Sequence, residues 1–174
     1  MRDYSPLPAG KKIYFASDFH LGIDLEYSSR ERERMLCEWL EQIRSDAHAI
    51  YLVGDLFDFW FEYDTVVPKG FVRLLGTLAD IGDSDIELCL FTGNHDMWTF
   101  GYLEEEIGCP VYKEPVIRMY GNDRFMIGHG DGLGPGDKGY KRLKRVFSNP
   151  FMQWLFARLH PNLGIWLANY WSGR

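Results

Sequence analysis

The chain of 174 residues is 46% hydrophobic, a composition that suits one soluble domain with a sizeable core. Its three cysteines are scattered, the first residues lack an apolar leader core, and no window reaches ~18 uncharged apolar residues, so we expect a reduced cytosolic protein without disulfides, secretion signal or membrane span. The net charge of −6 is uneven, because residues 1–137 hold all 25 acids, whereas residues 138–174 hold seven bases and no acid.

Hydrophobic periodicity predicts an alternation of strands and helices, which is typical of an α/β fold. In chain order we expect a strand at 13–17, a helix at 30–44, a strand at 49–53, a helix at 71–81 with Gly82 as its C-cap, a strand at 87–92 and a short helix at 102–107. Residues 116–120 and 124–127 flank a turn sequence and predict a β-hairpin. From Asp137 onward the pattern is helical, with breaks at Pro150 and Pro161.

Four of the apolar runs end in a small residue followed by side chains that bind metals. The four segments are Ser17-Asp18-Phe19-His20, Gly54-Asp55, Gly93-Asn94-His95-Asp96 and Gly128-His129-Gly130-Asp131. An open α/β sheet binds its ligands at the ends of its strands, so we expect these side chains to meet at one edge.

The first two segments supply mainly carboxylates. Asp18 and His20 are two residues apart, so on an extended segment they point to the same side and can bind one cation, although an Asp-x-His triplet alone is common. Gly54 lets the backbone approach a ligand, and the two oxygens of Asp55 can bridge two metals. Asp58 is expected to cap a helix or to support the site.

The third segment, Asn94-His95-Asp96, is the most specific of the four. The amide oxygen of Asn94 is a neutral metal ligand, which leaves His95 free to donate a proton or a hydrogen bond to a phosphoryl oxygen. Asp96 is expected to orient that imidazole by accepting its second N–H. A Gly-Asn turn with a surface histidine is the structural alternative.

The fourth segment adds a nitrogen ligand, His129, whereas His48 and His160 are expected to be structural or solvent-facing. Mixed oxygen and nitrogen ligands without cysteine favour Mn²⁺, Fe or Zn²⁺ over Mg²⁺ or Ca²⁺, and we expect two divalent ions with Mn²⁺ as the first choice. Two such ions can clamp a phosphorus centre for in-line displacement. The predicted chemistry is therefore phosphoester or pyrophosphate hydrolysis.

In this order, the four segments resemble those of the calcineurin-like metallophosphoesterases. The resemblance implies that Asp18 and His20 hold one metal, that Asn94 and His129 hold the other, and that Asp55 bridges them. It also implies an α/β/β/α layered sandwich, with a metallophosphoesterase core at residues 1–136 and a helical, lipid-facing insertion at 137–174. The family places a Gly-His-x-His segment after such an insertion; none is present here, so we expect a truncated chain with an incomplete second sheet.

Residues 52–60, 129–133, 137–140 and 149–154 are similar to the branch of that family that acts in lipid A biosynthesis. This implies cleavage of the pyrophosphate of UDP-2,3-diacylglucosamine to lipid X and UMP, by a protein peripheral on the cytoplasmic face of the inner membrane. The expected partners are this UDP-linked diacyl sugar lipid and the anionic membrane surface, and no nucleic acid. The substrate-binding residues implied are Asn94, His95, Asp131, Asp137, Tyr140, Lys141, Arg142 and Lys144.

The basic, aromatic tail fits an anionic and partly apolar partner, but packing among helices would also account for its aromatic residues. That branch carries Asn-Arg-Asp where this chain has Asn94-His95-Asp96, so a nucleotide or another phosphodiester is the alternative substrate. An inactive fragment that binds membranes through its tail is the alternative of a different class.

Overall fold

A computed structural model describes residues 3–5, 7–131 and 138–172 of the chain. The strands are β1 (Asp3–Ser5), β2 (Lys12–Ala16), β3 (Ala47–Val53), β4 (Glu87–Phe91), β5 (Val111–Tyr112), β6 (Val116–Tyr120) and β7 (Asp123–Ile127). The helices are α1 (Ser29–Ile43), α2 (Val72–Gly82), α3 (Tyr102–Ile107), α4 (Lys138–Phe147), α5 (Pro150–Ala157) and α6 (Pro161–Ser172).

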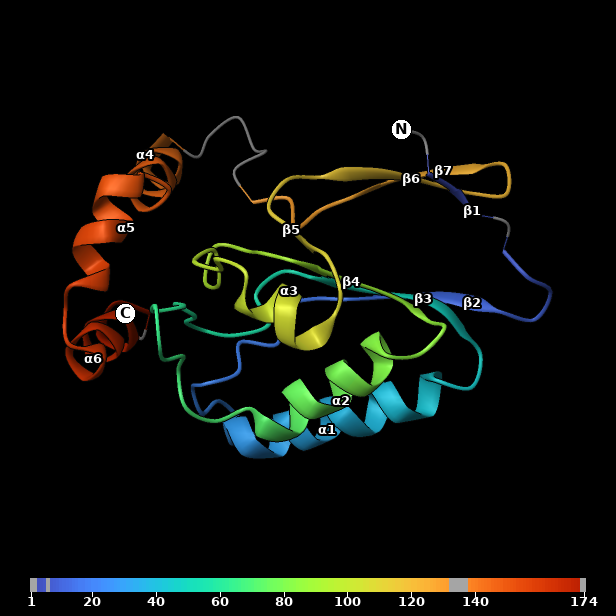
Figure 1. Cartoon of the computed structure of the whole chain (residues 1–174), viewed down its shortest axis with the longest axis horizontal. Helices are drawn as coiled ribbons and strands as arrows, with labels where there is room; N and C mark the ends of the chain where they lie inside the picture. The colour runs from blue at the N-terminus through green and yellow to red at the C-terminus, as the bar shows by residue number, and fades with distance from the viewer. Residues whose placement is uncertain (1–2, 6, 132–137, 173–174) are drawn as a thin grey trace.

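The strands form two sheets that lie one above the other (Figure 1). In the four-stranded sheet, β2, β3, β4 and β5 are neighbours in that order and all parallel. In the three-stranded sheet, β6 lies between β1, to which it is parallel, and β7, to which it is antiparallel. Helices α1 and α2 cover the outer face of the parallel sheet, so the described core has the layers α/β/β (Figure 1).

Strand β3 is buried on both faces because its alternate side chains belong to different cores. Ile50 and Leu52 pack in the larger core, between the parallel sheet and its helices. Ala49 and Tyr51 pack in the smaller core, between the two sheets. The continuous apolar sequence of β3 therefore places it at the centre of the molecule, and the residues that follow it lie where the layers meet.

The three helices α4, α5 and α6 stand at one end of the sheets (Figure 1). Phe156 of α5 packs on Phe61 and Trp98, with ring centroids 4.9 and 4.7 Å apart. The indole N–H of Trp98 donates to the carbonyl of Phe147 at 2.8 Å. These contacts fix the helical segment to the loops that follow β3 and β4.

The mixed α/β fold with a parallel sheet is confirmed, and the predicted elements match the observed ones to within one or two residues at most boundaries. The short strands β1 and β5 were not predicted. The predicted C-cap is wrong: Gly82 is the last residue of α2, and a Cβ there would lie 1.9 Å from the carbonyl oxygen of Ile107, so its role is close approach of α2 to α3. Among the described residues, the outer face of the three-stranded sheet carries no helix (Figure 1).

Candidate metal centre

The predicted ligand segments meet at one edge of the molecule. Asp18 and His20 follow β2, Asp55 follows β3, and His95 follows β4, which are neighbouring parallel strands with their carboxyl ends on the same side. His129 follows β7 and therefore comes from the other sheet. Asn94 lies half-buried in the turn after β4.

One group of possible metal ligands consists of Asp18, Asp55 and His129, whose ligand atoms all lie within 4.8 Å of one another. The buried Asp55 is central, because its Oδ2 lies 3.3 Å from Nε2 of His129 and 3.8 Å from Nε2 of His20. Nε2 of His20 is also 4.0 Å from Oδ1 of Asp18. This geometry supports the predicted bridging role of Asp55.

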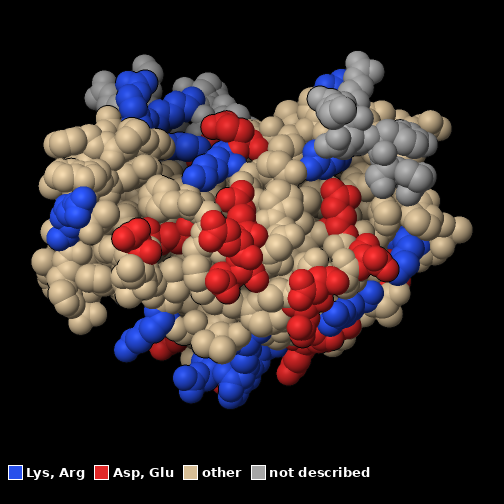
Figure 2. All heavy atoms as spheres, viewed as in Figure 1, with Lys and Arg blue, Asp and Glu red and all other residues tan. Residues whose placement is uncertain are grey.

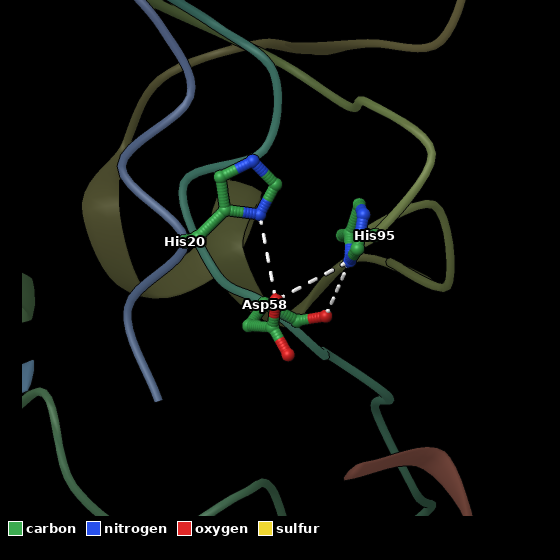
Figure 3. A group of neighbouring side chains, drawn as sticks. All are labelled: His20, Asp58 and His95. Carbon is green, nitrogen blue, oxygen red and sulfur yellow. Dashed lines mark hydrogen bonds and ion pairs between the residues drawn. The ribbon is translucent and has the colours of Figure 1, made fainter. Parts of the chain in front are cut away.

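A second group consists of His20, Asp58 and His95 (Figure 3). Oδ1 of the buried Asp58 lies 3.5 Å from Nδ1 of His20 and 3.5 Å from Nδ1 of His95. Nδ1 of His95 also lies 2.9 Å from the carbonyl oxygen of Asp58. Asp58 begins no helix, so of its two predicted roles the supporting one fits the structure.

The hydrogen bonds assign the protons on two imidazoles, because a carbonyl oxygen can only accept. His129 donates Nδ1–H to the carbonyl of Val53 at 2.9 Å, which leaves Nε2 facing Asp55. His95 donates Nδ1–H to the carbonyl of Asp58. His129 therefore has the arrangement of a metal ligand, with one nitrogen held by an acceptor and the other aimed at a carboxylate.

The backbone of the centre is unusual. Non-glycine residues rarely have positive φ, but Asp18, His20 and Asp55 have φ of 61°, 44° and 52°. Each such residue costs ~1–3 kcal/mol and persists only when its surroundings hold it. Three of the predicted ligands therefore share a strained conformation, as is typical of functional sites.

Two glycines make room for the ligands. A Cβ on Gly54 would lie 2.5 Å from Nδ1 of His129, and one on Gly93 would lie 2.1 Å from Oδ1 of Asp55. Gly54 also has a φ of 85°, which favours glycine. The glycines that precede Asp55 and Asn94 thus allow the three loops to touch.

The predicted partner of His95 is wrong. The carboxylate of Asp96 accepts backbone N–H groups instead, from Gly93 at 2.7 Å, Leu56 at 2.8 Å, and Asp55 and Phe57 at 3.3 Å. Burial raises the pKa of Asp96 to about 6, against the effect of these hydrogen bonds. Asp96 fastens the loop after β3 to the loop after β4, and Asp58 is the carboxylate that faces His95.

The charges of Asp55 and His129 are coupled. Burial alone would raise the pKa of Asp55, but the imidazole of His129 and the backbone N–H of His95 hold that pKa below its ordinary value. The hydrogen bond to Asp55 raises the pKa of His129 to about 9, despite the opposing effect of burial. A cation that binds here must displace a proton from His129.

The side chains of the centre suit divalent cations, because carboxylates and imidazoles converge there. His129 and His20 each direct Nε2 to the carboxylate of Asp55, and the Nδ1 of each lies near an oxygen acceptor. The residues present could thus hold two ions around Asp55.

Of the residues predicted to contact substrate, Asn94 and His95 follow β4, Asp131 follows β7, and Lys141 and Lys144 lie on α4. Lys144 of α4 forms an ion pair with Asp131 at 2.6 Å, and Lys141 is exposed. Asp137 lies outside the described residues, as do the side chains of Tyr140 and Arg142. Figure 2 shows basic side chains gathered near α4 and acidic ones across the core. In the part of the chain that is described, no helix is long and apolar enough to span a membrane.

A parallel α/β sheet with Asp and His groups at the carboxyl ends of its strands is a metallophosphoesterase-like arrangement. No family model matches the chain. The chain is 42% identical over 158 residues to a protein of Porphyromonas gingivalis named UDP-2,3-diacylglucosamine hydrolase, which covers 90% of this chain and 60% of that protein. Proteins of the same name from Aeromonas salmonicida and Pseudomonas aeruginosa are 31% and 30% identical, over 83% and 84% of this chain.

The chain is therefore a homologue of proteins named UDP-2,3-diacylglucosamine hydrolase, which confirms the resemblance predicted from its motifs. It spans 55–60% of the length of these three curated relatives. Among solved structures, a protein of unknown function from Aquifex aeolicus is similar with a TM-score of 0.47 and 17% identity, over 76% of this chain and 69% of that one.

Proposed function

We propose that the intact protein hydrolyses the pyrophosphate of UDP-2,3-diacylglucosamine to lipid X and UMP. The observation that carries the proposal is the 42% identity to a protein named for this hydrolysis, along 90% of the chain. The convergence of Asp18, His20, Asp55 and His129 at one edge supplies the site for such chemistry. Bound divalent ions, with Mn²⁺ as our first choice, would supply Lewis-acid activation of water and of the phosphoryl group.

The protein side chains would then have distinct roles. Asp18 and His20 would hold one ion, Asn94 and His129 would hold the other, and Asp55 would contact both. His95 is held through Nδ1 by Asp58, so its other nitrogen would be the one that contacts a substrate oxygen. To donate from that nitrogen His95 must be protonated, and in that form it would stabilise negative charge developing on the phosphoryl oxygens.

In this proposal, residues 1–136 form the catalytic core and residues 137–174 form a helical segment that binds the lipid. Large apolar side chains on α5 and α6 are exposed, among them Phe151, Trp154 and Trp166. The segment also carries bases without acids. Both features suit acyl chains and an anionic inner-membrane surface, at which the protein would be peripheral on the cytoplasmic side.

Incubation of the intact protein with UDP-2,3-diacylglucosamine and Mn²⁺, followed by mass spectrometry, tests the reaction. We expect lipid X and UMP, and neither product when the metal is removed with a chelator. If an intact, metal-loaded protein forms neither, the substrate assignment is wrong.

One observation favours a second candidate, the hydrolysis of a nucleotide or another phosphodiester. His95 stands where the lipid A branch is expected to have arginine, and its ring is placed beside the predicted metal ligand His20, with ring centroids 4.6 Å apart. Activity on a generic aryl phosphodiester with none on UDP-2,3-diacylglucosamine would favour this candidate.

The exposed aromatic side chains also support a third candidate function, membrane binding by the 174-residue chain. In that case the 174 residues would dock on membranes through α4–α6 without catalysis. Membrane binding together with an absence of Mn²⁺ binding would favour this third candidate.

A further inference from the structure

The loop between β2 and α1 carries Asp18 and His20, both with positive φ, and one side of this loop is held by the segment after β3. The N–H of Asp18 donates to the carbonyl of Gly54 at 3.1 Å, and the N–H of His20 donates to the carbonyl of Asp55 at 2.9 Å. The N–H of Leu21 continues the series to Leu56 at 3.1 Å. Three N–H groups of the loop are thus bonded to the segment after β3.

Three carbonyl groups of the same loop accept from one side chain, Arg32 of α1, while the carbonyl of Leu21 accepts the N–H of Asp58 at 2.9 Å. The guanidinium of Arg32 donates through Nη1 to the carbonyl of Phe19, and through Nη2 to the carbonyls of His20, at 3.1 Å, and Ile23. Arginine suits this task because its donors lie in one rigid plane. The loop is therefore held on both sides, and Arg32 is the side chain that joins the carbonyls of Phe19, His20 and Ile23.

The position of Arg32 has no explanation in the stability of α1. Arg32 lies in the first turn, where the positive end of the helix dipole disfavours a cation. The start of α1 is already capped, because Ser28 and Glu31 form a capping box. The three carbonyl contacts are thus the interactions that account for a half-buried guanidinium at this place.

We propose that Arg32 is a positioning residue that holds the Asp18–His20 loop in its ligand-bearing conformation and thereby sets the cation affinity of that half of the centre. The inference rests on the proposed function, because it assumes that Asp18 and His20 bind a metal. Arg32 acts through the backbone and donates to the carbonyls of Phe19, His20 and Ile23. Loss of a group that orients metal ligands without touching the metal typically lowers metal affinity by ~10–100-fold.

Electrostatics alone predicts the opposite result. Arg32 is a cation near a cation site, so removing its charge should by itself strengthen Mn²⁺ binding. Weaker binding by Arg32→Gln would therefore report lost positioning. The matched control is Arg30→Gln, which removes the same charge from an exposed position in the same helical turn.

The first measurement is amide hydrogen exchange of the metal-free protein. We expect Arg32→Gln to speed exchange in a peptide that spans residues 17–24, while Arg30→Gln leaves it unchanged and circular dichroism shows both variants folded. If Arg32→Gln does not fold, Arg32→Lys serves in its place, because one ammonium cannot reproduce the planar fork.

The second measurement is calorimetric titration with Mn²⁺. We expect Arg32→Gln to weaken binding ~10–100-fold, with Arg32→Lys intermediate and Arg30→Gln unchanged. In an Asp18→Ala background the same change should have no further effect, whereas in a His129→Ala background it should remove the remaining binding.

The outcomes separate the two proposals. If the wild-type chain binds Mn²⁺ and Arg32→Gln leaves that binding unchanged or strengthens it, the role of Arg32 is overturned but the metal centre is not. Equal losses of affinity in the Asp18→Ala and His129→Ala backgrounds would have the same meaning. Absence of Mn²⁺ binding by the wild-type chain would overturn the metal centre and this inference with it.

Discussion

Asp55 is the side chain that the two halves of the candidate centre share. It faces His20 and His129, receives the backbone N–H of His95 at 2.9 Å, and sits 3% exposed where the layers meet. A bridging ligand serves both ions at once. Asp55→Ala should therefore abolish metal occupancy at both positions, as measured by elemental analysis of the intact protein. Occupancy of one full site would contradict the bridging assignment.

His95 differs from the predicted ligands His20 and His129, whose Nε2 atoms lie 3.8 and 3.3 Å from Asp55, because its contacts run through Nδ1 to Asp58. We predict that His95→Ala retains both metals and lowers kcat by ~10²–10⁴, since a proton or hydrogen-bond donor to the phosphoryl group is lost. Metal analysis and steady-state kinetics on the same preparation test this. His160→Ala, at an exposed position between α5 and α6, is the control that should change neither quantity.

The coupling of Asp55 and His129 predicts how Mn²⁺ binding depends on pH. His129, with its pKa raised to about 9, carries a proton in the metal-free protein at neutral pH. Binding must release that proton, so affinity should rise with pH toward 9, by up to ~10-fold per unit, and then level off. Titrations under anaerobic conditions between pH 7 and 9 measure the slope, and a flat profile would contradict it.

The interaction between Asp55 and His129 also affects the stability of the metal-free protein, and this stability changes with pH in the opposite direction to Mn²⁺ affinity. The pKa of His129 is raised above the ordinary value of 6.5, so its contribution to stability is complete below that pH and is lost as pH rises through about 9. Alkaline pH thus destabilises the metal-free form while it favours metal binding.

At the scale of elements, buried carboxylates take the place of ordinary helix caps. Helix α2 has no side-chain cap of its own, and Glu33 of α1 accepts the N–H groups of Arg73 and Leu74 at 3.2 and 3.3 Å. Glu62 similarly accepts the N–H groups of Tyr102 and Leu103 at the start of α3. A carboxylate at a helix N-terminus is favoured by hydrogen bonding and by the helix dipole.

Glu33→Ala should therefore lower the free energy of unfolding by about 2 kcal/mol, the upper range for a lost cap. Glu38→Ala, on the exposed face of the same helix, should have little effect. Denaturant unfolding of the metal-free variants measures both. Equal effects of the two substitutions would show that Glu33 does not act as a cap.

The elements could be predicted where periodicity is strong, as for α1, α2 and β3. Strands β1 and β5 have three and two residues and exist through pairing with distant strands, which leaves no local pattern. The side chains of metal-ligand type that follow the apolar runs predicted which residues come together at the candidate metal centre. The sequence could not show that Asp96 accepts backbone N–H groups, that Asp58 lies between two imidazoles, or that Arg32 contacts the Asp18–His20 loop. Such contacts depend on the geometry of the loops.

At the scale of the whole molecule, the acidic residues are separated from the segment that carries bases and exposed aromatic side chains. The core carries the acids, and the segment from α4 onward combines bases with exposed aromatic side chains (Figure 2). Sedimentation with vesicles that contain anionic phospholipid tests whether this surface binds membranes. Changing Lys141, Arg142, Lys144 and Arg145 to Glu should abolish sedimentation with the vesicles. Unchanged binding would show that these basic residues do not contribute to membrane binding.

His129 is the one predicted ligand that comes from the three-stranded sheet, whereas Asp18, His20, Asp55 and Asn94 come from the parallel sheet. A cation bound between Asp55 and His129 would act as a cross-link between the two sheets, much as a disulfide joins distant parts of a chain. Resistance to unfolding should then increase with the concentration of free metal. Removal of the metal by a chelator would therefore weaken the attachment between the two sheets and also abolish the hydrolysis.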